Sequence, residues 1–289
     1  MMTLGDKITR RMTAWAGATT CVFVALMWAG TTVASAQWHS PDLTRLEVTG
    51  FSTDIPDFGR VWTKDRAAYP GGESSFECGG LIGANDFPLS QCEVPVADLL
   101  ALAHPRLLAW VDFAGPSDEY LSPRYDCVVN SLPNLLGDVY QQMWTRNSDK
   151  MMIHYEQGNR YREIWMDGRK HPPMTEQFYM GHSVGWFEGD EFIVDTQNFT
   201  FDIDGFDDHS HLPTSHLKHL IEHYRKTGED TMELTITVFD PLFMLSPLMY
   251  KHYFHTPEAD AQYLRVWECD PETSRRELSV MAPDKYEGQ

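Results

Sequence analysis

Five of the twelve histidines of this chain lie in one stretch, DDHSHLPTSHLKHLIEHYRK at 207–226. An imidazole titrates near neutral pH and is also a common metal ligand, so such a stretch offers either acid/base or metal chemistry. Within it, His219, Glu222 and His223 match the pattern H-x-x-E-H, which on a helix brings two zinc ligands and a catalytic glutamate together. The choice between these chemistries depends on whether the stretch forms a helix or a strand.

The residues that follow favour a strand. The turn TGED at 227–230 precedes the β-forming run TMELTITV, which needs a partner strand. In a strand, His219 and His223 lie about 13 Å apart, too far for one metal ion. The expected hairpin sets His223 opposite Leu234 and turns both imidazoles towards an apolar inner face. Each histidine could simply be satisfied by a neighbour, but two on one inner face favour a polar site in a cavity.

A second hairpin is expected around Gly158-Asn159, between MMIHYEQ and RYREIWMD. Its apolar face carries Tyr155 opposite Arg162. A guanidinium keeps its proton, so a buried one needs an acceptor or an anionic ligand. In the expected site the imidazoles act as general acid and base, while the guanidinium and the phenol polarise a substrate oxygen. The expected catalytic residues around this cavity are Tyr155, Arg162, His219 and His223.

An acidic stretch, DIDGFDDHSH at 202–211, offers oxygen ligands at alternate positions around a glycine. That arrangement suits Ca²⁺, although the full length and the closing glutamate of an EF-hand are missing. The neighbouring histidines add ligands that transition metals take. A solvated acidic loop is the alternative. The candidate ligands for a divalent metal are Asp202, Asp204, Asp207, His209 and His211.

Two short motifs lie between the hairpins. GHSVG matches the nucleophile pattern G-x-S-x-G around Ser183, but a hairpin follows it where a helix is needed, which disfavours a serine hydrolase. DGRKHP supplies a turn across which Asp167 and Arg169 can pair, and His171 can point into the cavity mouth. A rigid corner is the alternative. The residues expected to bind a substrate are His171, Arg169 and Ser183.

The stretches REIWMDGRKHP, MGHSVGWFEGDEFIVDT and SHLKHLIEHYR resemble a broad set of exported bacterial proteins, with the likeness running from residue 120 to 245. That set combines D-G-R-x-H-P, G-x-S-x-G-x-W-E-G-D-T-L-V-V-x-T and S-x-x-L-H-x-x-E-R. The resemblance implies an exported β-rich fold and no particular chemistry. This chain departs from the set at Phe187, Glu191 and His223, where tryptophan, threonine and arginine are usual. The positions on the shared motifs are Arg162, Asp167, Arg169, His171, Ser183, Glu188, Asp190, Ser215, His219 and Glu222.

The elements that must position these residues are mainly strands. Four successive hairpins, the last pairing LMYKHYFH with AQYLRVWE, predict an antiparallel meander over 150–282. About eight strands without intervening helices would close into a calycin- or lipocalin-like barrel around a cavity, with a β-sandwich as the alternative. Residues 37–149 are expected to be irregular, apart from a helix near 96–113 that Pro105 breaks or kinks.

The first 36 residues combine a basic start, a long apolar run and a small-residue A-S-A end, which is typical of a cleaved signal peptide. An uncleaved membrane anchor is the alternative. We therefore expect a periplasmic or secreted protein in which the remaining cysteines form disulfides. The favoured pairs are Cys78–Cys92 and Cys127–Cys269.

The formal net charge of −19 disfavours nucleic acid and anionic lipid as partners. No nucleotide-binding motif is present, so no organic cofactor is expected, and a divalent metal is kept open. The expected partner is a small molecule, and the sequence leaves the oligomeric state open. We expect an exported lyase, isomerase or hydrolase that acts on a small, partly apolar molecule through histidine acid/base chemistry. The alternatives are a non-catalytic binding protein and a metal-dependent protein that uses 202–211.

Overall fold

The structure, a computed structural model, describes residues 56–70, 76–77, 91–114 and 122–281. The chain divides into two compact units, Met1–Trp38 and His39–Gln289, and every described residue belongs to the second. The expected signal peptide and Cys78 lie outside the described residues. None of the helices within the described ranges is both long enough and apolar enough to cross a membrane.

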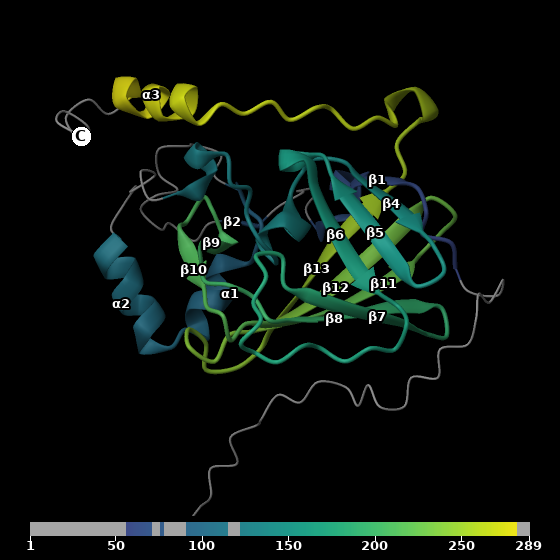
Figure 1. Cartoon of the computed structure of the whole chain (residues 1–289), viewed down its shortest axis with the longest axis horizontal. Helices are drawn as coiled ribbons and strands as arrows, with labels where there is room; N and C mark the ends of the chain where they lie inside the picture. The colour runs from purple at the N-terminus through teal and green to yellow at the C-terminus, as the bar shows by residue number, and fades with distance from the viewer. Residues whose placement is uncertain (1–55, 71–75, 78–90, 115–121, 282–289) are drawn as a thin grey trace, which may run out of the picture. The chain divides into compact units, whose positions relative to one another are not determined.

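The main feature is a closed β-barrel, which confirms the predicted mainly β fold (Figure 1). Among the described residues, nine strands close it in the order β1-β13-β12-β11-β8-β7-β6-β5-β4. All neighbouring strands are antiparallel except β6 and β7, which are parallel because the segment 166–181 crosses over between them. The barrel strands are β1 Val61–Lys64, β4 Gln142–Arg146, β5 Lys150–Tyr155, β6 Arg160–Trp165, β7 His182–Glu188, β8 Glu191–Gln197, β11 His219–Lys226, β12 Thr231–Phe239 and β13 Leu248–His255.

Shorter elements lie outside the barrel. The pair β2 (Phe76–Glu77) and β3 (Gln91–Cys92) and the pair β9 (Asp202–Asp207) and β10 (Leu212–Thr214) each form a two-stranded sheet. The predicted helix near 96–113 is present as two helices, because the proline at 105 cannot continue a helix begun before it. The helices are α1 Val96–Ala101, α2 Pro105–Ala114 and α3 Pro271–Met281, with short 3₁₀ turns at Arg66–Ala68, Pro123–Asp126, Asn134–Gly137, Gln157–Asn159 and Ala259–Ala261.

The barrel does not have the extent expected from the sequence. Strands β1 and β4 come from the range 37–149, which we expected to be irregular, so the barrel extends beyond 150–282. The predicted fourth hairpin is wrong, since residues 262–270 contain no strand. The physical reason is closure: β13 already pairs with β12 on one side and β1 on the other, so no free edge remains for another strand.

The interior of the barrel has an aromatic level and a polar level. Phe58, Trp144 and Tyr224 belong to the aromatic level, with ring centroids 5.9 Å apart for Phe58–Trp144 and 4.8 Å apart for Trp144–Tyr224. Two positions earlier in β4 and β11, the inward-facing residues are the polar Gln142 and Glu222, both buried. The buried polar residues of the interior are Lys64, Gln142, Tyr155, Arg162, Ser183, Thr196, Glu222, Tyr250 and His252.

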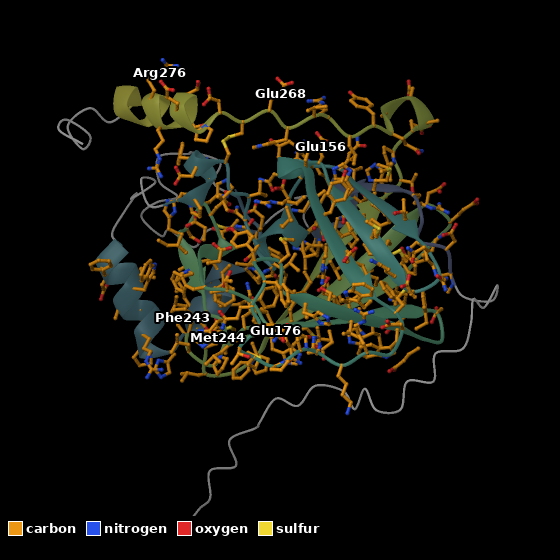
Figure 2. All side chains as sticks on the ribbon, viewed as in Figure 1. Glu156, Glu176, Phe243, Met244, Glu268 and Arg276 are labelled. Atoms are coloured by element: carbon orange, nitrogen blue, oxygen red, sulfur yellow. A yellow bond between two sulfur atoms is a disulfide. The ribbon has the colours of Figure 1, made fainter. Side chains whose placement is uncertain are left out.

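A disulfide joins Cys127 to Cys269, as predicted, across a sequence separation of 142 residues (Figure 2). It ties the segment that follows β13 to the loop before β4. Cys92 is also disulfide-bonded. The predicted partner of Cys92 is Cys78, which lies outside the described residues. The disulfides fit the oxidising environment of an exported protein.

Candidate functional site

Arg162 lies inside the barrel, as predicted, but another residue of the chain already compensates its charge. Its side chain is 1 % exposed and forms a bidentate ion pair with Glu222, at N–O distances of 2.8 and 2.6 Å. Its Nε donates to Ser183 Oγ at 3.0 Å, and Nη2 donates to Thr196 Oγ1 at 2.7 Å. The acceptor that a buried guanidinium needs is therefore internal, and these contacts give Arg162 and Ser183 a structural role.

Tyr155 shares this interior with Arg162, although the hairpin register differs from the prediction. On β5 and β6, Tyr155 pairs with Arg160 and Ile153 pairs with Arg162, two residues away from the expected pairing. A shift of two residues leaves each side chain on its original face, because strand side chains alternate. Tyr155 and Arg162 are accordingly 3 % and 2 % exposed.

The prediction that His219 and His223 face the interior is wrong. The β11–β12 hairpin pairs Tyr224 with Leu234, one residue away from the expected register. The cause is a three-residue loop, 228–230, in place of the expected four; a backbone hydrogen bond of 3.0 Å closes this loop. A slip of one residue turns every side chain of a strand to the opposite face.

The register places Glu222 and Tyr224 inside the barrel. Both residues are 0 % exposed, and the Tyr224 hydroxyl donates to Glu222 Oε2 at 2.6 Å. His223 lies outside, with a side chain that is 38 % exposed and an Nδ1 that is 3.2 Å from Glu191. His219 also lies on the outer face. The expected cavity site of two imidazoles, a guanidinium and a phenol is therefore not assembled.

On the outer face, His219 meets another predicted residue, His171. Both imidazoles approach Asp195 Oδ1, with Nε2 of His219 at 2.8 Å and Nε2 of His171 at 3.4 Å. Nδ1 of His171 is 3.0 Å from Nδ1 of His182. Burial alone would raise the pKa of Asp195, but the hydrogen bonds from His171 and His219 outweigh it and hold that pKa well below its ordinary value. Burial, together with His171, lowers the pKa of His182 to about 4.

The DGRKHP motif forms the corner that delivers His171 to this cluster. Arg169 pairs with Asp167, as predicted, and its guanidinium lies 3.3 Å above the ring of Trp165. The amide of Asn198 donates to three backbone carbonyls of the segment 166–181, at 2.9 to 3.1 Å. This segment covers Asp195, which is 0 % exposed. His171 therefore lies on the outer wall and not at a cavity mouth, and Arg169 is turned to its own motif.

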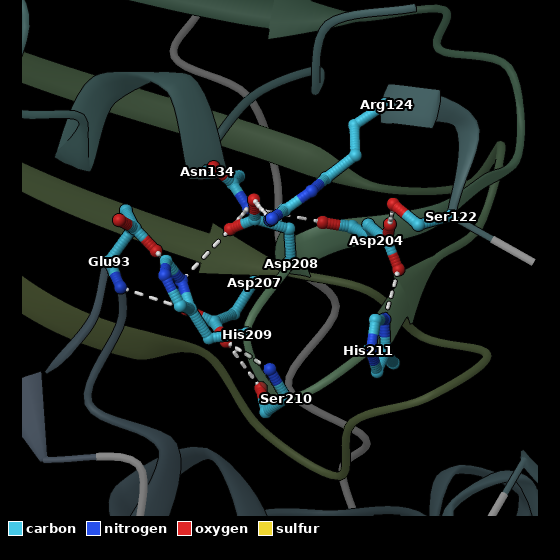
Figure 3. Close-up of polar contacts among 10 residues, drawn as sticks. All are labelled: Glu93, Ser122, Arg124, Asn134, Asp204, Asp207, Asp208, His209, Ser210 and His211. Carbon is cyan, nitrogen blue, oxygen red and sulfur yellow. Dashed lines mark hydrogen bonds and ion pairs between the residues drawn. The ribbon is translucent and has the colours of Figure 1, made fainter. Parts of the chain in front are cut away.

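The predicted metal ligands of 202–211 fall into two groups, and Figure 3 shows four of them, Asp204, Asp207, His209 and His211. In the first group, Asp204 accepts from the Ser122 hydroxyl at 2.5 Å and lies 3.1 Å from Nδ1 of His211. Asp202 accepts the Ser131 backbone N–H at 3.0 Å. These contacts attach β9 to the loops beside it, and they are structural.

The second group gathers potential metal ligands: Glu93, Asp207, Asp208 and His209 offer ligand atoms within 4.8 Å of one another. Nδ1 of His209 lies 3.3 Å from Glu93 Oε2 and 3.1 Å from Asp208 Oδ1. Arg124 Nη1 donates to Asp208 Oδ2 at 2.9 Å. Asp207 also holds the backbone, since it accepts the N–H of Glu93 at 2.8 Å. Of the five predicted ligands, Asp207 and His209 belong to this group.

This second group borders a pocket of about 470 Å³. The segment after β13 supplies one wall, which the Cys127–Cys269 disulfide holds in place. Another wall contains Val129, against which the β5–β6 turn packs so closely that a Cβ at Gly158 would lie 1.8 Å from it. The lining residues are Glu93, Arg124, Tyr125, Cys127, Val128, Val129, Asn130, Asp138, Val139, Tyr140, Gln157, Asp208, His209, Trp267, Cys269 and Ser274.

The pKa values of three titratable groups of the pocket, Glu93, Asp138 and His209, are raised, and that of Asp208 is lowered by its hydrogen bonds with His209 and Asn134 in spite of its burial. Burial, reinforced by Asp208 and Asp207, raises the pKa of Glu93 well above its ordinary value. Burial raises the pKa of Asp138 to about 7. Hydrogen bonds with Asp208 and Glu93 raise the pKa of His209 to about 11. At neutral pH the pocket thus presents an imidazolium paired with Asp208 and an Asp138 near its midpoint, beside a Glu93 whose proton is held more tightly than that of an ordinary carboxyl group.

Sequence reasoning missed Glu93, Asp138 and Asp208 as members of a site. Glu93 and Asp138 come from the range 37–149, where no periodic pattern marked them. Asp208 lies within the acidic stretch but was not among the five predicted ligands. The signal that could have indicated these residues is the predicted Cys127–Cys269 bridge, because it brings the C-terminal segment to the loops around Asp138.

Comparison of the chain with protein-family models, with curated proteins and with solved structures finds no match. We therefore infer the function from the residues of the pocket itself.

Proposed function

We propose that this chain is an exported enzyme that performs acid/base chemistry on a small, partly apolar molecule, and that the reaction takes place in the pocket beside Glu93 and Asp138. The observation that carries the proposal is the convergence of carboxyl groups on a pocket of about 470 Å³, where the pKa values of Glu93 and Asp138 are raised and that of Asp208 is lowered. A pair of groups whose environments separate their pKa values is the usual basis for one acid and one base in a single site.

The dimensions and the lining of the pocket favour a small organic molecule. Its volume falls within the roughly 300–1,000 Å³ that is typical of small-molecule sites. Val128, Val129 and Val139 with Trp267 supply apolar walls, whereas Arg124 supplies a fixed positive charge. The substrate class is therefore a compact molecule with an apolar body and an oxygen that develops negative charge.

Each polar group then has a role. Asp138, with a pKa of about 7, exchanges protons near neutral pH as the general base. Glu93, whose pKa burial raises, serves as the general acid. Arg124 and the imidazolium of His209 stabilise an oxyanion. A lyase, isomerase or hydrolase without an organic cofactor needs no more than these groups.

The test is a screen of small carboxylic acids, lactones and phenols by thermal shift, followed by mass spectrometry of each stabilising compound. A compound at a hundredfold its dissociation constant stabilises by about 2.7 kcal/mol. Turnover should fall by roughly 10²–10⁴-fold in Asp138→Asn and Glu93→Gln. Asp190→Asn, an exposed aspartate on the β7–β8 turn, is the matched control. If a stabilising compound keeps its mass, the chain is a binding protein instead.

A second candidate, a divalent-cation site, is favoured by the ligand atoms of Glu93, Asp207, Asp208 and His209, which lie within 4.8 Å of one another. Three carboxylates and one imidazole suit a borderline divalent ion such as Mn²⁺ or Zn²⁺. A cation there would displace the protons of Glu93 and His209.

Elemental analysis of the purified protein and titration with Mn²⁺, Zn²⁺ and Ca²⁺ test this second candidate. Binding should release protons and should be lost in Asp208→Asn and His209→Ala, while His216→Ala, at an exposed histidine, should bind normally. Equal binding by all three variants would exclude this site.

A further inference from the structure

Two buried oxygens in the wall of the pocket have no hydrogen-bond partner. Of the buried side-chain atoms without a partner in the described part of the chain, two belong to residues that line the pocket, Asn130 Oδ1 and Gln157 Oε1. Asn130 is 2 % exposed, and Gln157 is half-buried. Each atom is an amide carbonyl oxygen, which accepts hydrogen bonds and does not donate them. Since buried polar atoms are ordinarily paired, this wall needs donors that the described chain does not supply.

The two oxygens come from segments that pack directly against each other. Asn130 follows Val129 and Gln157 precedes Gly158, and a Cβ on Gly158 would lie only 1.8 Å from Val129 Cγ2. Gly158 also has a φ of 64°, a left-handed conformation that glycine adopts without strain, so both its size and its backbone suit this close contact. Asn130 and Gln157 therefore hold neighbouring positions in one wall of the pocket.

An aromatic ring supplies an apolar surface of the same pocket. Trp267, which lines the pocket, is 38 % exposed and meets Tyr140 edge-on, with ring centroids 6.0 Å apart and an interplanar angle of 84°. The Cys127–Cys269 disulfide fixes the chain two residues after this tryptophan. The indole of Trp267 is thus held in place, and its face can pack against another ring.

The charges of the pocket favour a neutral donor over an ammonium group. Arg124 and the imidazolium of His209 carry positive charge, and both pair with Asp208. Burial raises the pKa values of Glu93 and Asp138, which lessens their negative charge at neutral pH. Asp208 is already paired, so an ammonium group gains little here, whereas a hydroxyl can donate to an amide oxygen without adding a charge.

We propose that the substrate of this pocket is a hydroxylated ring compound, with its ring against Trp267 and its hydroxyl groups donating to Asn130 Oδ1 and Gln157 Oε1. This inference rests on the proposed function and names the class of its substrate. It also gives the two amides a role in specificity, because a site that binds a hydroxyl rejects an analogue that leaves its acceptors unpaired. The ring then contributes affinity, and the hydroxyl groups contribute selectivity.

The test compares catechol, guaiacol and veratrole, in which the same ring carries two, one and no hydroxyl donors. Calorimetric titration of the full chain at pH 7 under argon should give catechol a dissociation constant at least tenfold lower than that of veratrole, with guaiacol between them. Asn130→Leu and Gln157→Met should each remove most of this preference, whereas Trp267→Leu should weaken all three compounds by a similar factor. Gln177→Met, at an exposed glutamine outside the pocket, is the matched control and should bind like the unmodified chain.

The two amide variants also distinguish a binding role from a structural one. The replaced oxygens have no partner in the described chain, so Asn130→Leu and Gln157→Met should not lower the melting temperature. A lower melting temperature together with an unchanged preference for catechol would show that the amides are structural and would contradict the proposal.

A further measurement needs no substitution. In proton–nitrogen NMR of the unmodified chain, the side-chain amide resonances of Asn130 and Gln157 should shift on addition of catechol and stay in place on addition of veratrole. The titration and the NMR experiment both follow binding, so they test this inference even if no compound is turned over and the proposed function fails. If catechol and veratrole bind equally, or if none of the three compounds binds, water alone satisfies the two oxygens and the proposal is wrong.

Discussion

Replacement of Arg162 by methionine tests whether the ion pair inside the barrel is structural. The change leaves the Glu222 carboxylate buried, with the Tyr224 hydroxyl as its remaining donor. Removal of one member of a buried pair costs about 3–5 kcal/mol, because the other charge is left uncompensated. The uncompensated carboxylate can be neutralised by binding a proton. The loss of stability is therefore limited to about 1.4 kcal/mol for each pH unit by which the solution lies above the titration range of a carboxyl group.

In the reverse change, Glu222→Met, the uncompensated charge cannot be neutralised, because a guanidinium does not lose its proton. We therefore expect Arg162→Met to be less stable than the unmodified chain by about 3–4 kcal/mol at pH 8, and by clearly less at pH 5. Glu222→Met should lose at least as much, at both pH values. The double variant should recover most of the loss, because two apolar side chains leave no charge behind.

Urea denaturation followed by tryptophan fluorescence at pH 5 and pH 8 measures these differences. For a domain of this size each kcal/mol corresponds to about 2–4 °C in melting temperature, so thermal scans should agree. The matched control is Lys150→Met, which breaks an exposed pair with Glu163 between the same strands, β5 and β6, and should change stability by about 1 kcal/mol or less. Equal, pH-independent losses in both single variants, or a double variant as unstable as either, would refute the reasoning.

Three further predictions follow from the pocket and the outer wall. The pKa of Asp138 is raised to about 7, so the protonated carboxyl stabilises the folded state at low pH, and this stabilisation is lost as the pH rises through 7. Between pH 5 and pH 8, the stability of Asp138→Asn should therefore rise by roughly 1–2 kcal/mol relative to the unmodified chain, as measured by urea denaturation. A stability difference that does not change with pH would contradict this. Loss of the bridge in Cys127→Ser/Cys269→Ser, which spans 142 residues, should lower stability by up to about 5 kcal/mol and speed proteolysis after β13, as mass spectrometry of the fragments would show; unchanged cleavage would count against a fixed pocket wall. Asp195→Asn should speed amide exchange in 166–181 and remove the loss of stability that the lowered pKa of Asp195 produces at acid pH, with unchanged exchange as the contrary result.

The two hairpins show which part of this fold the sequence could predict. The loop after β5 is two residues longer than expected, and Tyr155 and Arg162 stayed on the predicted face. The loop after β11 is one residue shorter, and His219 and His223 moved to the opposite face. The residue pattern predicts which segments are strands. The face of the sheet to which each side chain points depends on the loop length, because a change by an odd number of residues turns every side chain over, and short sequence signals do not determine that length.

The candidate pocket could not be predicted from the sequence, for a different reason. Glu93 and Asp138 lie in segments whose backbone is fixed by long-range contacts; Glu93, for example, is held through its N–H to Asp207, 114 positions away. Such positions carry no periodic pattern. What the sequence did provide was the cysteine pairing, since an even number of cysteines in a chain that is expected to be exported predicts disulfide bridges.

Three residues that line the pocket, Trp267, Cys269 and Ser274, follow the last barrel strand in the chain and are therefore synthesised after it. A nascent chain that has been synthesised as far as β13 already contains all nine barrel strands. It still lacks the pocket wall that these residues provide. The wall becomes covalently attached only after the thiols of Cys127 and Cys269 are oxidised. A chain held in a reducing compartment would therefore carry a finished barrel without an anchored pocket wall, and the pocket would be completed only where thiol oxidation is possible.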